Sequence, residues 1–300
     1  MTDEAQRREQ YVTDQVLASF AGAPTPRFRE LMEALVRHSH AFVREVRLTE
    51  PEWQAAIDFL TRAGHLTDDR RQEFILLSDV LGLSMLTIAV NQPPEPEATE
   101  ATVFGPFFVA GAPEVAYGGD LSRGASGQPC WVEGAVRGLD GKPVAGARLD
   151  VWEADGDGQY DVQYDDDRMA ARGHQFTDEQ GRYGFWCVTP TPYPIPDDGP
   201  VGDLLKAAGR GPMRAAHLHI MVAAPGFHRL VTHIFVRGDA YQDSDSVFGV
   251  KQSLIVDFEE QPAGTPAPGG RAVDGAFRRA YFDIVLAPEQ QSLGPEQENR

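Results

Sequence analysis

The spacing of hydrophobic residues changes near residue 95 of the chain. Before that point, apolar residues recur every three or four positions, which is typical of helices that bury one face. This spacing predicts helices over residues 3–20, 26–46 and 50–63, and a fourth from residue 67 to about residue 90. Prolines at positions 93, 94 and 96 forbid a continuing helix, so residues 91–97 are interpreted as a linker.

Beyond the linker, apolar and polar residues alternate in short runs that are separated by turn residues. This alternation is typical of strands with one buried face, and Asp140-Gly141 is a common hairpin signal. Short strands with turns between them favour an antiparallel sandwich or barrel. We therefore expect a helical domain over residues 1–95, a β-rich domain over residues 96–290 and a polar tail over residues 291–300. The predicted strands cover residues 131–136, 147–152, 182–187, 217–222, 230–236 and 252–258.

Composition and charge narrow the classes of function. The formal net charge is -18, whereas a nucleic-acid binder would normally carry a basic face, so no nucleic-acid partner is expected. Two cysteines, Cys130 and Cys187, do not make a disulfide framework and are expected to be reduced and packed. The sequence has neither the apolar segment of a signal peptide nor a run near the roughly 20 residues of a membrane span. A cytoplasmic protein is the expectation.

The pair His217 and His219 is the sharpest chemical signal. Residues two apart on a strand point to the same side, so both imidazoles would face one site. Neutral imidazole is a common ligand of iron, copper, zinc and nickel. The alternative interpretation is two polar residues on a solvated strand face.

Two tyrosines strengthen the metal hypothesis. Tyr160 follows a turn at residues 155–158, and Tyr193 lies in a loop made stiff by its prolines at residues 189–196. A nearby cation stabilises a phenolate, and two phenolates would neutralise much of the charge of a ferric ion. Zinc prefers cysteine, histidine and carboxylate ligands, and few cysteines are present. The alternative for each tyrosine is a half-buried ring with a hydrated hydroxyl. The acidic stretch 155–167 lacks the full calcium-loop pattern and is interpreted as solvated turns.

Four motifs follow one another in the β-rich region. They are Trp152-x-Ala154-x-x-x-Gly158-x-Tyr160, Thr177-Asp178-Glu179-Gln180-Gly181-Arg182-Tyr183, Pro192-Tyr193-Pro194-Ile195-Pro196 and Arg214-Ala215-Ala216-His217-Leu218-His219. In this order they resemble the intradiol ring-cleavage dioxygenases. The resemblance implies a β-sandwich catalytic core, preceded by an N-terminal helical domain that builds a homodimer interface where a phospholipid can lie in a hydrophobic tunnel.

Matched position by position, the resemblance implies one ferric ion per subunit, held by Tyr160, Tyr193, His217 and His219. It also places the catalytic arginine at Arg214 and implies that Tyr193 takes up a substrate proton. Arg214 would stabilise negative charge on the ring, which is an electrostatic role. The alternative for Arg214 is an ordinary surface charge.

Segments 76–85, 103–107, 193–202 and 232–235 resemble the hydroxyquinol branch of this family. The expected reaction opens hydroxyquinol (benzene-1,2,4-triol) between its adjacent hydroxyls with dioxygen, giving 3-hydroxy-cis,cis-muconate, a tautomer of maleylacetate. Asp79 would accept a hydrogen bond from the third hydroxyl; the alternative is that it caps or solvates its helix. By similarity, the substrate pocket comprises Leu76, Asp79, Val103, Phe104, Gly105, Pro106, Phe107, Ile195, Pro196, His233 and Val247.

Two other functions stay open at this point. The first is cleavage of catechol or chlorocatechol by the same chemistry. The second is a metal-free binding module, because residues 132–183 also resemble transthyretin-like sandwich modules.

Overall fold

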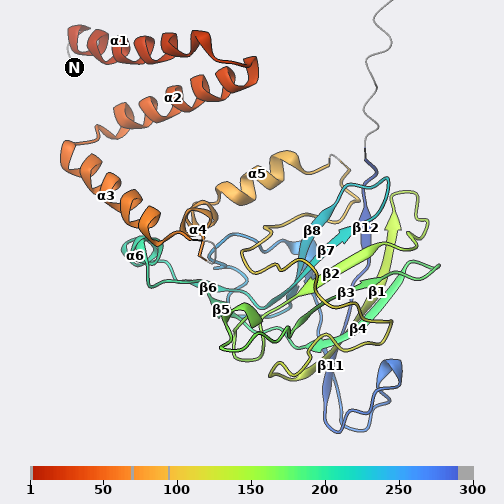
Figure 1. Ribbon diagram of the computed structural model, residues 1–300. Helices are drawn as coiled ribbons and strands as arrows, with labels where there is room; N and C mark the ends of the chain where they lie inside the picture. Colours follow the sequence, from red (N-terminus) through yellow and green to blue (C-terminus); the bar gives the residue numbers. More distant parts are fainter. Residues whose placement is uncertain (1–2, 69–70, 94, 290–300) are drawn as a thin grey trace, which may run out of the picture. The chain divides into compact units, whose positions relative to one another are not determined.

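A computed structural model describes residues 3–68, 71–93 and 95–289 of the chain (Figure 1). The chain divides into two compact units, residues 1–62 and 63–300. The expected domain boundary near residue 95 stays a prediction, and the expected polar tail at residues 291–300 lies outside the described residues.

The first unit is helical, as the spacing of apolar residues predicts. Thr25 caps the second helix by accepting a hydrogen bond from the Phe28 amide, and Pro26 provides the fixed φ of a first helical residue. Arg47 ends that helix in the left-handed region at φ 53°. Its elements are α1 (Asp3–Ser19), a 3₁₀ turn (Phe20–Gly22), α2 (Pro26–Val46) and most of α3 (Glu50–Leu66).

The prediction of one continuous helix over residues 67–90 is wrong. The structure has two helices there, α4 (Glu73–Val80) and α5 (Leu83–Asn91). Gly82 separates them at φ 73°, a conformation that glycine adopts readily and that ends a right-handed helix. Among the described residues, no single helix is both long and apolar enough to cross a membrane; α4 and α5 pass such a test only as a pair, with a bend of 75° between them.

The second unit contains the predicted β-sandwich, built from two five-stranded sheets. Most pairings are antiparallel, but β1 pairs with β11 and β12, and β8 with β9, in parallel. One sheet contains β10 (Glu259–Gln261), β11 (Phe277–Tyr281), β1 (Pro129–Gly138), β12 (Ile284–Leu286) and β4 (Arg182–Val188). The other has the order β3 (Arg172–Phe176), β2 (Arg148–Trp152), β7 (His217–Ala223), β8 (Leu230–Val236) and β9 (Ile255–Val256). Outside them lie the short ribbon of β5 (Tyr193–Pro194) with β6 (Met213–Arg214), and α6 (Pro200–Ala207).

Two strand predictions need correction. Asp140-Gly141 does form a tight turn, in which the Gly141 amide donates to the Gly138 carbonyl, and Arg137 and Pro143 form one antiparallel bridge beside it. However, β1 before the turn and β2 after it belong to different sheets, so they do not pair as a hairpin. Residues 252–258 begin as a 3₁₀ turn at Gln252–Leu254, and only Ile255–Val256 form a strand.

The alternation along β7 separates the core from the site. Leu218, Ile220 and Val222 belong to the hydrophobic core between the sheets, together with residues such as Phe185. His217 and His219 occupy the intervening positions and therefore project from the opposite face. Both cysteines are buried and free, as predicted.

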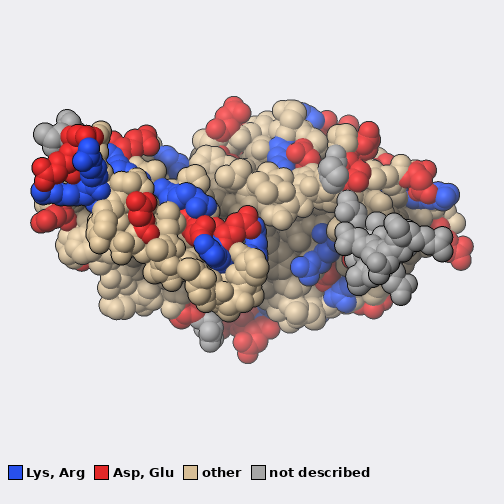
Figure 2. All heavy atoms as spheres, turned by 90° about the horizontal axis from the view of Figure 1, so that it is seen from above, with Lys and Arg blue, Asp and Glu red and all other residues tan. Residues whose placement is uncertain are grey.

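The charged side chains do not gather by sign on the face that Figure 2 shows. Lysine and arginine side chains lie next to aspartate and glutamate there.

Candidate metal and substrate site

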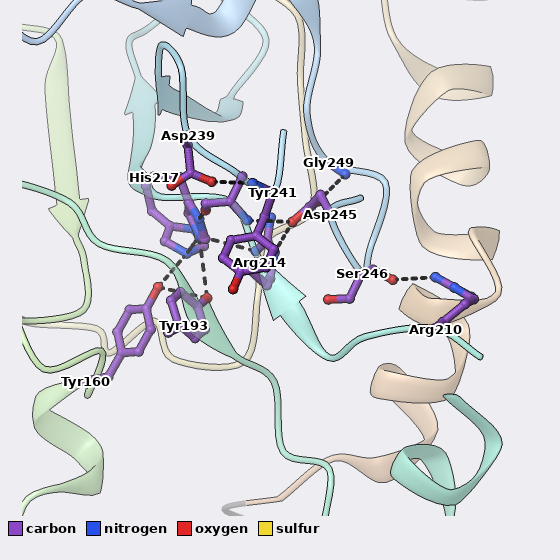
Figure 3. A network of polar contacts seen from close by, with 12 residues as sticks. Tyr160, Tyr193, Arg210, Arg214, His217, Asp239, Tyr241, Asp245, Ser246 and Gly249 are labelled. Carbon is purple, nitrogen blue, oxygen red and sulfur yellow. Dashed lines mark hydrogen bonds and ion pairs between the residues drawn. The ribbon is translucent and has the colours of Figure 1, made fainter. Parts of the chain in front are cut away.

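The structure brings together the four side chains that were predicted as metal ligands, and Figure 3 shows three of them, Tyr160, Tyr193 and His217. Their terminal atoms form a closed ring. The Tyr160 and Tyr193 hydroxyls are 3.1 Å apart, and the His217 and His219 Nε2 atoms are also 3.1 Å apart. Two further contacts close the ring. His219 Nε2 lies 3.0 Å from the Tyr160 hydroxyl, and His217 Nε2 lies 3.4 Å from the Tyr193 hydroxyl.

Three local structures position these four side chains. The histidines lie on β7, the Tyr160 backbone begins a 3₁₀ turn at Asp161–Gln163, and Tyr193 lies on β5. All four are buried. The sandwich therefore converges residues from three separate stretches of sequence on one point.

The hydrogen bonds of His217 fix its tautomer. Its Nδ1 lies 2.6 Å from the Ala215 carbonyl oxygen, which can only accept, so Nδ1 carries the proton and Nε2 is left as a lone pair. Burial, reinforced by Arg214, lowers the pKa of His217 to about 3, so the ring is neutral. Burial, with His217 acting in the same direction, lowers the pKa of His219 well below its ordinary value. Neutral imidazole is the form that binds metal ions.

The ring of four donors fits a cation. Atoms spaced in this way can all lie about 2 Å from a common centre, the usual length of a metal–ligand bond. Burial raises the pKa of both phenols, and in Tyr193 the nearby Arg214 opposes that rise. Phenolates at this place would require a strong positive charge, which a trivalent metal ion supplies. In addition, His219 Nδ1 has no hydrogen-bond partner among the described residues.

A third imidazole stands beside the two on β7. His233 lies on β8 directly opposite His219, and their ring centres are 4.1 Å apart. His217, His219 and His233 together form a buried group that can hold a metal ion. The sequence placed His233 in the substrate pocket, and the structure places it next to the histidine pair.

Arg214 is not a surface charge. It lies on β6 opposite Tyr193, is buried, and its Nη1 is 3.2 Å from His217 Nε2. Its Nε donates to Asp245 at 3.1 Å, and Asp245 also accepts from the Ala215 and Gly249 amides. Although burial opposes the shift, Arg214 and the Gly249 amide lower the pKa of Asp245. The pair therefore holds a guanidinium charge beside the four predicted ligands.

A second buried ion pair supports Tyr160. Arg172 donates through two nitrogens to Asp161, the residue after Tyr160, and through Nη1 to the Phe107 carbonyl at 3.0 Å. The Phe107 ring in turn stacks on Tyr160, with 4.4 Å between ring centres. Trp152 stacks similarly on His219 at 4.7 Å. Tyr160 and His219 are thus each packed against an aromatic plane.

A cavity of about 650 Å³ adjoins this site. Its walls include Asp79 and Leu76 from α4 and Phe107, which contacts Tyr160. Asp79 is buried, and burial raises its pKa while Ser84 and Arg214 oppose the rise. Five of the predicted pocket residues line the cavity: Leu76, Asp79, Pro106, Phe107 and Pro196.

The other predicted pocket residues lie elsewhere. Gly105 packs against His219, since a Cβ there would be 3.1 Å from His219 Cε1. Phe104 is part-exposed and packs on Trp152, with 5.7 Å between ring centres. The remaining ones are buried and do not line this cavity: Val103, Ile195, His233 and Val247.

Sequence reasoning missed the residues that hold the site in place. Asp245, Asp161 and Arg172 lie outside the motifs or in their gaps. A buried arginine needs an acidic partner, so Arg214 predicts one, but no local pattern says which acid it is.

Comparison with known proteins gives consistent matches. A family model described as "Dioxygenase" matches residues 103–288, and one described as "Catechol dioxygenase N terminus" matches residues 25–99. A hydroxyquinol 1,2-dioxygenase from Nocardioides simplex is 64% identical over 95% of this chain and 97% of its own length.

Two solved structures are also similar. The hydroxyquinol 1,2-dioxygenase from Pseudomonas putida DLL-E4 has a TM-score of 0.88 and 46% identity, covering 95% of this chain and all (100%) of that one. The catechol 1,2-dioxygenase from Pseudomonas arvilla C-1 has a TM-score of 0.80 and 29% identity, covering 97% and 94%.

Proposed function

Since this chain belongs to the intradiol ring-cleavage dioxygenase family, we propose that it is a hydroxyquinol 1,2-dioxygenase that uses ferric iron. It opens benzene-1,2,4-triol between its two adjacent hydroxyls with dioxygen and yields 3-hydroxy-cis,cis-muconate, a tautomer of maleylacetate. The observation that carries the proposal is the closed ring of two phenol and two imidazole donors. The identity to the relative from Nocardioides simplex supports the choice of substrate.

Tyr160, Tyr193, His217 and His219 would hold one ferric ion per subunit. Two phenolates and two neutral imidazoles suit a trivalent ion better than zinc, which prefers thiolate, imidazole and carboxylate. When bound, the iron supplies a Lewis acid and a template for the diol. The ring planes of Phe107 and Trp152 keep Tyr160 and His219 in place while substrate binds.

Tyr193 takes up a proton from the substrate. Its hydroxyl is 3.1 Å from that of Tyr160 and 3.4 Å from His217 Nε2, so it lies among the donors. Burial raises the pKa of Tyr193, as it does that of Tyr160, so the choice of Tyr193 as the proton acceptor rests on the family resemblance and not on this shift. Tyr160, whose ring stacks on Phe107, would hold the iron and is assigned no proton transfer.

Arg214 stabilises negative charge on the bound ring. Its charge is buried, fixed by Asp245, and needs no rearrangement when substrate arrives. One of its nitrogens, Nη2, has no hydrogen-bond partner among the described residues. Its burial and its partner Asp245 make it a preorganised source of positive potential.

Asp79 selects the triol. It is a buried carboxyl in the wall of a cavity that Leu76, Pro106 and Phe107 also line. The third hydroxyl of hydroxyquinol can donate to it, whereas catechol would leave it without this hydrogen bond, with Ser84 as its remaining hydrogen-bond partner. A hydrogen bond to a charged group contributes about 1.5–3 kcal/mol, which corresponds to roughly 10- to 150-fold in kcat/KM.

We also propose that the protein is a homodimer joined through the first unit. The helices there expose large apolar side chains, among them Leu35 at 60% and Phe42 at 55% exposure. A cavity of about 360 Å³ in this unit combines apolar Val12, Val43 and Leu48 with Arg44 and Arg47, which suits a phospholipid with its phosphate. Light scattering with lipid extraction tests both statements; a monomer without lipid would contradict them.

Optical spectroscopy with metal analysis tests the iron site. The purified protein should contain about one iron per chain and show a tyrosinate-to-iron charge-transfer band. Tyr193→Phe should retain iron at least in part, alter the band and lower turnover, because the proton acceptor is gone. Unchanged turnover in that variant would remove Tyr193 from the scheme, and a colourless, iron-free protein after reconstitution would remove the whole proposal.

Turnover of hydroxyquinol and catechol tests the substrate. The wild-type protein should prefer hydroxyquinol, and Asp79→Asn should reduce that preference. A strong preference of the wild type for catechol would assign it to catechol cleavage.

A further inference from the structure

Helices α4 and α6 lie close together in the second unit (Figure 1), and two hydrogen bonds show that they run in the same direction. Glu73 at the start of α4 contacts the start of α6, and Arg210 just after α6 contacts the end of α4. The two helices therefore place both N-termini at one end and both C-termini at the other. Of the two, α4 forms a wall of the cavity, through Leu76 and Asp79 among other residues.

A buried acid joins the two N-termini. Gly199 precedes α6 and has no side chain to cap it, so the Val201 amide has no partner within its own helix. Glu73, which is fully buried, accepts from that amide at 3.0 Å and also from Arg71 Nε at 3.1 Å. A carboxylate at the N-terminal ends of two parallel helices interacts favourably with both helix dipoles.

A base joins the two C-terminal ends. Gly209 has φ 65°, which ends α6 and lets the Arg210 amide bond back to the Leu205 carbonyl. The Arg210 guanidinium then donates through Nη1 to the Val80 carbonyl at 2.6 Å, one of the carbonyls left without a partner at the end of α4. The opposite ends of the pair thus carry the charges that the dipoles favour.

The same guanidinium reaches the loop that holds Arg214. Its Nη2 donates to the Ser246 carbonyl at 2.9 Å, and its plane lies 4.7 Å from the centre of the Phe248 ring (Figure 3). Asp245, the partner of Arg214, is the residue before Ser246. Asp79 is the residue before Val80. Arg210 therefore bonds to the backbone immediately after each of the two acids that matter for substrate binding.

We propose that Arg210 is a positioning residue that sets how strongly the site favours a triol over a diol; this rests on the proposed function. Its planar fork fixes the end of α4 that carries Asp79 against the loop that carries Asp245. Without it, the Val80 and Ser246 carbonyls lose their common donor, and the carboxyl of Asp79 is free to move relative to Arg214. A displaced Asp79 would still be present but would no longer meet the third hydroxyl.

The test is a double-mutant cycle on the full-length, iron-loaded protein. Arg210→Met keeps an aliphatic side chain of similar length and removes the guanidinium group. It should lower the ratio of kcat/KM for hydroxyquinol to that for catechol by about tenfold, with iron content and the visible band unchanged. In an Asp79→Asn background, which has already lost the discriminating group, Arg210→Met should change the ratio by less than about twofold.

Two further variants separate positioning from general damage. Arg210→Lys offers a single point charge that can reach one carbonyl but not both, so it should recover only part of the ratio. Arg229→Met removes an exposed arginine of the same unit and should leave the ratio as in the wild type. Arg210→Met with an unchanged ratio, or with the same loss in both backgrounds, would overturn the proposal.

The outcome is distinguishable from failure of the proposed function. A wild type that does not favour hydroxyquinol refutes the substrate assignment. The inference on Arg210 is then decided by the same cycle in kcat/KM for the preferred substrate, where coupling between Arg210 and Asp79 supports it and additivity overturns it.

Discussion

The buried pair of Asp161 and Arg172 should carry a large share of the stability of the ligand-bearing turn. Asp161 accepts hydrogen bonds from Arg172 Nε at 2.6 Å and from a second guanidinium nitrogen. It also accepts one from the Ala170 amide at 3.2 Å. Asp161→Asn preserves the shape of the side chain and removes its charge. Arg172, with its side chain only 2% exposed, would then be a buried cation without a counter-charge.

The expected cost follows from that burial. Removing one partner of a buried ion pair destabilises a protein by about 3–5 kcal/mol, because the remaining charge stays out of water. For a unit of this size, each kcal/mol lowers the melting temperature by roughly 2–4 °C, so the midpoint should fall by about 10 °C. Iron should also leave faster, since Asp161 follows Tyr160 and Arg172 holds the Phe107 carbonyl.

Thermal unfolding followed by circular dichroism measures the fall in melting temperature. Loss of the visible band in excess chelator measures the rate at which iron leaves. Asp257→Asn is the matched control, because its pair with Arg237 has side chains that are 64% and 49% exposed. Such a pair contributes about 0–1 kcal/mol. An Asp161→Asn protein as stable as the control variant would refute the reasoning.

Two other variants probe the site and the core. Gly249→Ala adds a Cβ that would lie 2.9 Å from Arg214 Nη2, so kcat should fall by about tenfold or more while iron content is retained; an unchanged kcat would contradict the role of Arg214. Burial raises the pKa of Glu153 well above 4.5, so the folded protein holds a proton that the unfolded chain releases, and stability should fall as pH rises from about 4.5 toward that raised value. Glu153→Gln should flatten this part of the dependence, which urea midpoints between about pH 5 and about pH 9 would measure; an unchanged slope would exclude Glu153 as its cause.

Local signals explain why some elements were predicted well. The second helix begins at Pro26 and ends at Val46 as predicted, and its boundaries are set by neighbours in sequence, Thr25 and Arg47. The prediction of a single fourth helix was wrong because the spacing of apolar residues continues through Gly82. The backbone at Gly82 has φ 73°, which ends a right-handed helix. Tertiary packing can override local helix propensity, and the spacing of hydrophobic residues alone does not show where it does so.

Pairing between strands is decided by residues far apart. The turn at Asp140-Gly141 forms where the sequence signals it, yet β1 pairs with β4 and β2 with β7. A turn signal predicts a change of direction, whereas the partner of each strand depends on which faces become buried together.

The candidate site divides in the same way. The four predicted ligands and Arg214 stand in motifs, and the structure brings their atoms together; their role as ligands stays a prediction. The residues that hold them are distant: Asp245 is 31 positions from Arg214, and Val80 is 130 positions from Arg210. A motif identifies the side chains that could bind a metal ion. It does not identify the distant residues that hold those side chains in place, because these contacts form only in the folded chain.

The placement of the histidines on β7 links metal binding to the stability of the core. Leu218 and Ile220 pack between the sheets, while His217 and His219 from the same strand place two neutral Nε2 atoms 3.1 Å apart. A cation held between these atoms would bind only the folded chain, because the unfolded chain does not bring them together. Binding free energy is then folding free energy, by the mass-action relation between ligand concentration and stability. A strand buried on both faces cannot shift to ease one side without disturbing the other, so the core that positions the donors also keeps them close together when no cation separates them.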